Sequence, residues 1–322
     1  MLLFVLLPLL ASPPAALPED ARNRTLRSEL ARIEDDSDGT LGVSIVDVVS
    51  GKSLSHRGED PFPMASVFKL PVAVVLLKKV DAGTLTLDEK LPVTRGDLRP
   101  RGPVFDRWKP GLSLAVGELL DDMMVASDNS AVDLLLRRLG GTKAVRKGLA
   151  ALGLSGIDVD ATELEMWLLS DGIPETPPDL RMTPEALKAR VAKVPAGDRK
   201  KAEQAFEKKP RNVATPEALG RLLVRLEKKE LLSPASTDRL LSAMRRCATG
   251  DHRIRAGVPK GSEVFDKTGT IGRCVNDVGL VRLPGGPTLA ISVFLKSSYL
   301  GETEREAVLA KVARASAQAF GR

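Results

Sequence analysis

The sequence predicts an α/β fold of the α+β type: one antiparallel sheet is built from both chain ends, flanked by terminal helices, and carries an inserted all-helical domain. Two observations lead to this prediction. Segments with strand-like alternation and β-branched residues lie near the two ends of the chain, and apolar residues between them recur mainly at helical spacing. A functional site is therefore expected at the junction of the sheet and the helices.

The sheet domain is assigned to residues 19–62 together with residues 246–322. Its first part contains a helix over residues 19–34, followed by a hairpin that turns at Ser50-Gly51. The predicted strands and the closing helix are Leu41 to Val49, Lys52 to His56, Val264 to Thr270, Val275 to Leu283, Thr288 to Lys296, and Glu302 to about Ala319.

The helical domain is assigned to residues 63–245. An apolar run over 70–77 predicts a buried helix that ends at Asp81-Ala82-Gly83. Two further helices are expected over Ser113 to Ala126 and Ser130 to Leu139, the second closed by Gly140-Gly141.

An enlarged loop, about 158–214, interrupts this domain. Thr183-Pro184 and Thr215-Pro216 each give a threonine cap with proline at the first helical position. Helices are expected over Ala186 to Val194 and Asp198 to Lys209. Residues 183–214 hold nine Lys or Arg and four Asp or Glu, so they supply most of the net charge of +6. A solvated helical excursion explains this stretch; contact with an anionic surface or peptidoglycan is the alternative.

Three short segments carry the chemical information: Ser66-Val67-Phe68-Lys69, Ser127-Asp128-Asn129 and Lys267-Thr268-Gly269-Thr270. A Ser-x-x-Lys match arises by chance about once in a chain of this length, whereas each of the others is expected well under about 0.1 times. A spacing of three residues places the serine and the lysine on one helix face. The unpaired N–H groups of a first helical turn favour negative charge at that serine.

These segments resemble the signature of class A serine β-lactamases and of penicillin-binding proteins. Residues 98–103 and 249–257 are also similar to class A segments, and the resemblance covers most of residues 38–322. It implies that Ser66 is the nucleophile, that Lys69 acts as a base, and that Ser127 relays a proton to the departing nitrogen. It also implies that Asn129 binds the substrate's side-chain amide, while Asp128 holds the loop as a cap.

The third segment is expected to bind the substrate. By the resemblance, Lys267, Thr268 and Thr270 hold a substrate carboxylate, and the N–H groups of Ser66 and Thr270 form the oxyanion hole. The resemblance also places Arg253 near that carboxylate as an added cation, which would explain why Asn276 or Asp277 stands where many class A members carry arginine. Taken alone, Arg253 is interpreted as a surface arginine.

Glu163 is the candidate for the base that releases the acyl-enzyme, by its distance from Leu152-Gly153. Its neighbours depart from the family pattern: Leu164 replaces a proline, Trp167 replaces the asparagine that holds the water, and Ala161 replaces the arginine that braces Asp160. Glu165 is a competing candidate, and surface carboxylates on an irregular loop are a third interpretation.

Residues 1–18 are predicted to be a signal peptide, because an apolar run is followed by small residues suitable for cleavage. The mature protein is then periplasmic or secreted, with no stable membrane association. No Lys or Arg precedes the apolar run, so an uncleaved anchor is the alternative. We expect a monomer. An aromatic content of 3% and secretion argue against nucleic-acid binding.

Two cysteines, Cys247 and Cys274, could form a disulfide in such a compartment, and the sequence leaves their pairing open. The two histidines, His56 and His252, are isolated. No ligands occur at metal-binding spacing, so neither a metal nor another cofactor is expected.

The first functional hypothesis is hydrolysis of the β-lactam ring of penicillin- or cephalosporin-type antibiotics through a Ser66 acyl-enzyme, with Glu163 assisting deacylation. The second keeps the nucleophile but releases the acyl group slowly, as a D,D-peptidase or penicillin-binding protein does. The third is a non-enzymatic sensor of peptidoglycan or β-lactams. Arg101 replaces an aromatic residue common in the family, and the substrate spectrum is left open.

Overall fold

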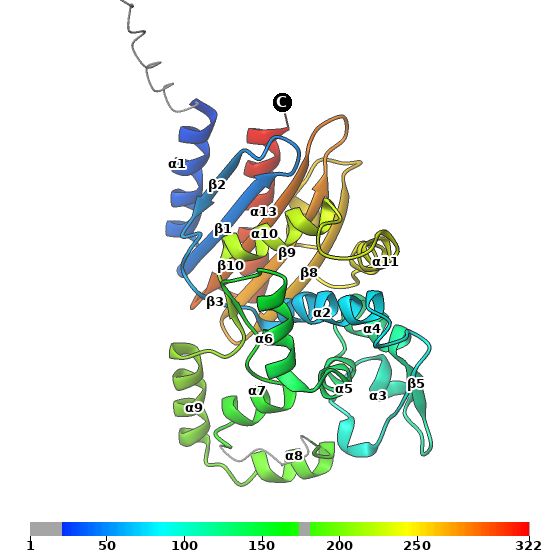
Figure 1. The fold of residues 1–322 in the computed structure, drawn as a ribbon. Coiled ribbons are helices and arrows are strands. Elements are labelled where there is room, and N and C mark those ends of the chain that lie inside the picture. The colour runs from blue at the N-terminus through cyan, green and yellow to red at the C-terminus, as the bar shows by residue number, and fades with distance from the viewer. Residues whose placement is uncertain (1–20, 174–180, 322) are drawn as a thin grey trace, which may run out of the picture.

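The computed structural model describes residues 21–173 and 181–321 and contains the expected sheet (Figure 1). Five antiparallel strands pair in the order β2-β1-β10-β9-β8, so that both chain ends meet in one sheet and the predicted fold class is confirmed. Their bounds are β1 Thr40–Asp47, β2 Ser53–His56, β8 Glu263–Ile271, β9 Cys274–Arg282 and β10 Thr288–Lys296.

Helices cover both faces of the sheet. The terminal helices α1 (Ala21–Asp36) and α13 (Glu302–Phe320) share one apolar core with inward-facing residues of β1 and β10. On the opposite face, α10 (Pro216–Glu227) joins the core of the helical part. Figure 1 shows α10 and α13 on opposite sides of the sheet. Burial on both faces makes β8 a rigid edge beside the helical part.

The helical part is organised around α2 (Lys69–Asp81), in which every residue from Lys69 to Leu77 is buried. The predicted helix over Ser113 to Ala126 is divided: β5 (Ser113–Ala115) pairs with β4 (Lys90–Pro92), and α4 (Val116–Val125) follows. The next helix, α5 (Asn129–Leu139), starts one residue earlier than predicted because Asp128 caps it by accepting from the Ala131 N–H.

The remaining elements of this part connect or flank those helices. Their bounds are η1 Ala65–Phe68, η2 Arg95–Asp97, α3 Pro103–Arg107, α6 Gly141–Ala151 and α11 Pro234–Arg245. The short helix α12 (Ile254–Gly257) belongs to the sheet part, where Ile254 shares the core of the terminal helices.

The enlarged loop contains three helices: α7 (Glu163–Ser170), α8 (Pro184–Val191) and α9 (Ala196–Lys208). Both later helices begin two residues before the predicted starts, since Pro184 follows the cap Thr183 and α9 starts directly after Pro195. The loop is closed at its base, where β6 (Ile157–Asp158) and β3 (Phe62–Pro63) flank β7 (Val213–Ala214).

The predicted signal peptide lies outside the described residues, as do Glu19 and Asp20. Across residues 21–173 and 181–321, no helix is long and apolar enough to cross a membrane. Cys247 and Cys274 are both free and buried, so the structure resolves the open pairing in favour of two thiols.

Candidate active site

Ser66 lies on η1, the 3₁₀ turn that leads into α2. The apolar residues of α2 fix this turn in the core, and the three-residue spacing brings the Lys69 Nζ within 3.0 Å of the Ser66 Oγ. The residue before the serine, Ala65, has φ +45°, a left-handed conformation that is strained for a residue with a Cβ. Ser66 therefore sits on a constrained backbone.

Strand β8 lies directly against this turn at Gly269. A Cβ built on Gly269 would come 2.5 Å from the Met64 O and 3.1 Å from the Ser66 N. Only glycine permits this approach. Asn276 on β9 fixes the same segment from the other side, because its Nδ2 donates to the Pro63 O (2.8 Å) and to the Met64 O (3.1 Å).

Lys69 is the centre of the polar contacts. Its side chain is fully buried, and its Nζ has five acceptor atoms around it: the Ser66 Oγ, the Ser127 O (2.8 Å) and Oγ (3.3 Å), the Asn129 Oδ1 (2.5 Å) and the Glu163 Oε1 (3.2 Å). An ammonium has three protons for these five acceptors. Proton movement among Ser66, Ser127 and Glu163 therefore needs only small displacements.

Ser127 lies between two lysines. Its Oγ accepts from the Lys267 Nζ at 3.0 Å and from the Lys69 Nζ at 3.3 Å, and its own φ is +57°. Burial, together with the charge on Lys69, lowers the pKa of Lys267 to about 7. A lysine with this pKa can carry a charge for anion binding and can also exchange a proton with Ser127 near neutral pH.

The other residues expected to bind substrate lie on β8. The Thr268 Oγ1 contacts the Thr249 Oγ1, and the Thr270 Oγ1 accepts from the Arg253 Nη2 at 2.7 Å. Arg253 is buried rather than on the surface, and its Nε donates to Glu306 at 2.9 Å. Arg253 thus places a cation next to Thr270, with its guanidinium anchored to the last helix.

Glu163 is the first residue of α7 and its side chain points into this cluster, with 5% of the residue exposed. Burial raises the pKa of its carboxyl, and Lys69 opposes the rise. Glu165 serves the helix start instead, since its carboxylate accepts from the Thr162 N–H and Oγ1 and so completes a capping box. Only Glu163 of the two reaches Lys69.

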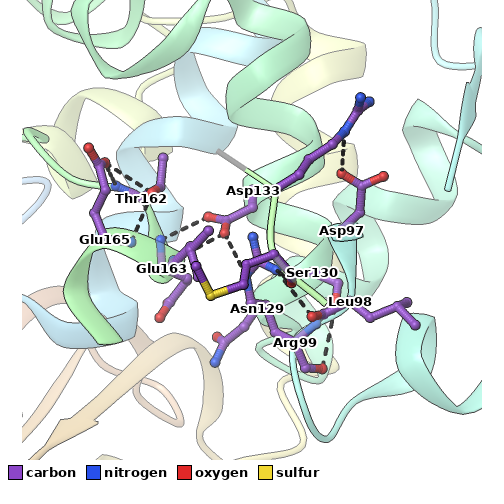
Figure 2. Close-up of polar contacts among 12 residues, drawn as sticks. Asp97, Leu98, Arg99, Asn129, Ser130, Asp133, Thr162, Glu163 and Glu165 are labelled. Atoms are coloured by element: carbon purple, nitrogen blue, oxygen red, sulfur yellow. Dashed lines mark hydrogen bonds and ion pairs between the residues drawn. The ribbon is translucent and has the colours of Figure 1, made fainter. Parts of the chain in front are cut away.

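Asp133, which sequence reasoning missed, fixes the start of α7. Its carboxylate accepts from the N–H groups of Glu163 (2.8 Å) and Leu164 (3.2 Å), and also from the Nε of the buried Arg99 (3.0 Å). Figure 2 shows Asp133 reaching from α5 to the backbone of Glu163. Asp133 follows Asn129 by four residues, so helical spacing could have indicated that both face one site.

A second missed pair closes the loop behind Glu163. Ala161 stands two residues before Glu163, where an arginine in the family would pair with Asp160. Here Arg211, from the far end of the loop, pairs with Asp160 instead. Asn212 accepts from the N–H groups of Asp160 (2.8 Å) and Ala161 (3.0 Å). The loop base is therefore braced by residues that are distant in the sequence.

Comparisons with known proteins agree with this geometry. The model of the Beta-lactamase enzyme family matches residues 25–320. The chain belongs to this family. It is 30% identical to the β-lactamase L2 of Stenotrophomonas maltophilia over 98% of this chain and 93% of that protein, and 28% identical to the β-lactamase VEB-1 of Pseudomonas aeruginosa over 92% and 90%.

Solved structures give the same result. An ancestral class A β-lactamase superposes with a TM-score of 0.75 at 32% identity, covering 92% of this chain and all of that one. The resemblance to class A β-lactamases stated from the sequence is confirmed.

In this β-lactamase-family chain, Trp167 and Arg101 border the cleft. Both line a hollow of about 450 Å³ together with Ser127 and Asn129. An indole offers a flat apolar surface and one donor, where an asparagine would offer both a donor and an acceptor. Among the described residues, no group of three or more His, Cys, Asp or Glu side chains could hold a metal ion.

Proposed function

We propose that this protein hydrolyses the amide bond of β-lactams through an acyl-enzyme on Ser66. One observation carries the proposal: the Nζ of the buried Lys69 contacts the proposed nucleophile, Ser127, Asn129 and Glu163 at once. Family membership and the names of the relatives support it.

Acylation begins when the Ser66 Oγ attacks the lactam carbonyl carbon. The serine proton passes to Lys69 or, through a water molecule, to Glu163; which of the two acts as base stays open. The N–H groups of Ser66 and Thr270 stabilise the negative oxygen of the tetrahedral intermediate. When the C–N bond breaks, Ser127 gives its proton to the nitrogen and regains one from Lys69 or Lys267.

Deacylation uses Glu163 as the base that removes a proton from water. The resulting hydroxide attacks the ester carbonyl, and the Ser66 oxygen leaves with a proton returned through Lys69. Lys267, Thr268 and Thr270 hold the substrate carboxylate, Arg253 adds positive charge behind Thr270, and Asn129 binds the side-chain amide. The mature protein acts as a periplasmic or secreted monomer.

Turnover of a chromogenic cephalosporin by the purified protein tests this proposal. Replacing Ser66 with alanine is expected to abolish turnover, and residual activity in that variant would reject Ser66 as the nucleophile. A variant with Ser262→Ala, a surface serine outside the cluster, is expected to keep full activity.

Slow release, as in a D,D-peptidase or penicillin-binding protein, is the second candidate. Trp167 favours it, because an indole beside the cleft cannot replace the two hydrogen bonds of an asparagine at the attacking water. Intact-mass measurement after mixing with a penicillin separates the two functions. An adduct that persists on the unmodified protein after the free penicillin is removed supports slow release. An adduct that is lost as fast as the penicillin is hydrolysed supports hydrolysis.

A further inference from the structure

Three hollows follow one another around α7 and share the residues at their borders. The cleft that contains Ser127 and Asn129 shares Pro100 and Trp167 with a groove of about 680 Å³ against α8. That groove shares Asp171 and Arg199 with a pocket of about 590 Å³ between α9 and the turn after β8. The candidate active site thus continues into the enlarged loop.

The far pocket also borders the catalytic segments. Ile271 follows Thr270 directly on β8, Pro63 precedes Ser66 by three residues, and Ser170 ends the helix that begins with Glu163. In Figure 1, α9 lies beside α7 and encloses this side of the molecule. A ligand held at Ser66 can therefore extend along surfaces that belong to the enlarged loop.

Two acidic side chains of the enlarged loop form ion pairs with arginines outside the loop. Glu185 on α8 pairs with Arg95, and Glu207 on α9 pairs with Arg273. These contacts dock the two helices and neutralise two of the carboxylates that line the hollows.

The cations of the hollows are left without such partners. In the described part of the chain, the exposed side chains of Arg101, Lys188, Arg199 and Lys200 form no ion pair. Among the described residues of the lining, the carboxylates without an ion pair are Asp171, Glu203 and the buried Asp128, and Asp128 accepts from two backbone N–H groups. Lys296 adds a cation whose Nζ is held by the Pro61 O at 2.8 Å. The lining therefore carries a surplus of positive charge, which favours an anionic ligand.

We propose that the enlarged loop forms an extended subsite for substrates whose acyl side chain ends in a carboxylate. The proposal rests on the proposed function for the position of the lactam ring. Trp167 lines both the cleft and the next groove, so its indole packs against the side chain, and the terminal carboxylate meets Arg199 and Lys188 beyond it.

The test compares a cephalosporin with an adipyl side chain and its hexanoyl counterpart, which has a methyl group in place of the terminal carboxylate. Binding is measured by calorimetry to the Ser66→Ala protein, so that the result does not depend on turnover. We expect roughly tenfold tighter binding of the adipyl compound at low salt, decreasing in 0.5 M salt because several exposed charges contribute.

In the double variant Lys188→Ala with Arg199→Ala, the adipyl compound is expected to bind less than about twofold more tightly than the hexanoyl compound. The matched control is Lys193→Ala with Lys208→Ala, which removes two exposed cations of the same loop that line none of the three hollows. A preserved preference in the control supports the subsite.

Equal affinity of the two compounds for the Ser66→Ala protein, or an equal loss of preference in both double variants, would overturn the inference. Failure of the unmodified protein to hydrolyse or to be acylated by any β-lactam, with the adipyl preference intact, would instead reject the proposed function.

Discussion

The two halves of the candidate site are built differently. The acylating half, Ser66, Lys69, Ser127 and Lys267, rests on α2, on the loop before α5 and on β8, all fixed in the main cores. The half proposed for deacylation rests on α7, which is held by its own buried apolar residues and also by the side chains of Asp133, Arg211 and Asn212. The proposed acylation step therefore depends on the apolar cores, whereas the proposed release step depends also on the contacts of Asp133, Arg211 and Asn212, here called the polar clamp.

The largest difference between the rates of acylation and deacylation is expected from Glu163→Gln. Loss of a general base typically costs 10² to 10⁴ in rate, so deacylation should fall about 10³-fold while acylation continues. Intact-mass spectra during reaction with a penicillin should then show an accumulating adduct. Glu165→Gln is the control; because glutamine also completes a capping box at this position, it should lower stability by less than about 1 kcal/mol and should not trap the adduct. Unchanged steady-state turnover in Glu163→Gln would reject its role.

Asp133→Ala should have the next largest effect. Its removal leaves Arg99 buried without its partner and frees two N–H groups of α7, which destabilises the fold by about 3 kcal/mol. Asp133→Asn keeps one acceptor and is the milder variant. We expect deacylation to slow by about 10²-fold in both, with acylation changed far less, as measured in single-turnover experiments. Equal slowing of both steps would show that the clamp serves the whole fold.

The acylating half should show its own pH dependence through Lys267. Its pKa of about 7 means that the free protein loses this positive charge as the pH rises through neutrality. The ratio kcat/KM should fall about tenfold per pH unit above that value, because the substrate carboxylate loses its partner. Lys267→Arg keeps the charge, so its descending limb should move to higher pH. An unmoved limb would assign the titration to another group.

The smallest effect on turnover is expected from Asp277→Asn. Asp277 lies on β9, opposite Thr268 of β8. Burial and the neighbouring Asp266 raise the pKa of Asp277 well above 3.8, and its Oδ2 accepts from the Ile254 N–H at 3.1 Å. Folded protein then keeps a proton that the unfolded chain has lost, so stability decreases as pH rises from about 4 towards the folded pKa. Denaturation of the asparagine variant should lack this decrease. The asparagine variant should therefore gain stability relative to the original as the pH rises above about 4, and an equal pH dependence of the two proteins would contradict this assignment.

Residue spacing along the chain predicted one part of the site from the sequence. The other part depends on contacts between residues that are distant in the sequence. Ser66 and Lys69 follow from a helical offset, and Asp128 follows from its preference for caps. The pairing of Asp160 with Arg211 could not be found in this way, because it depends on how an enlarged loop returns to its base. The directions of Arg253 and Trp167 depend on packing that no local pattern specifies. The sequence identifies Asn276 only as a candidate replacement for an arginine of the family. In the structure its side chain ties β9 to the segment before Ser66.

Because β6 pairs with β7 at the base of the loop, the length of the loop can change without moving Glu163. Because the two ends are already joined, adding chain between them costs only about 0.6 kcal/mol per doubling of length. The distal helices α8 and α9 could therefore be replaced without moving Glu163, and the proposed subsite would change its charge with them.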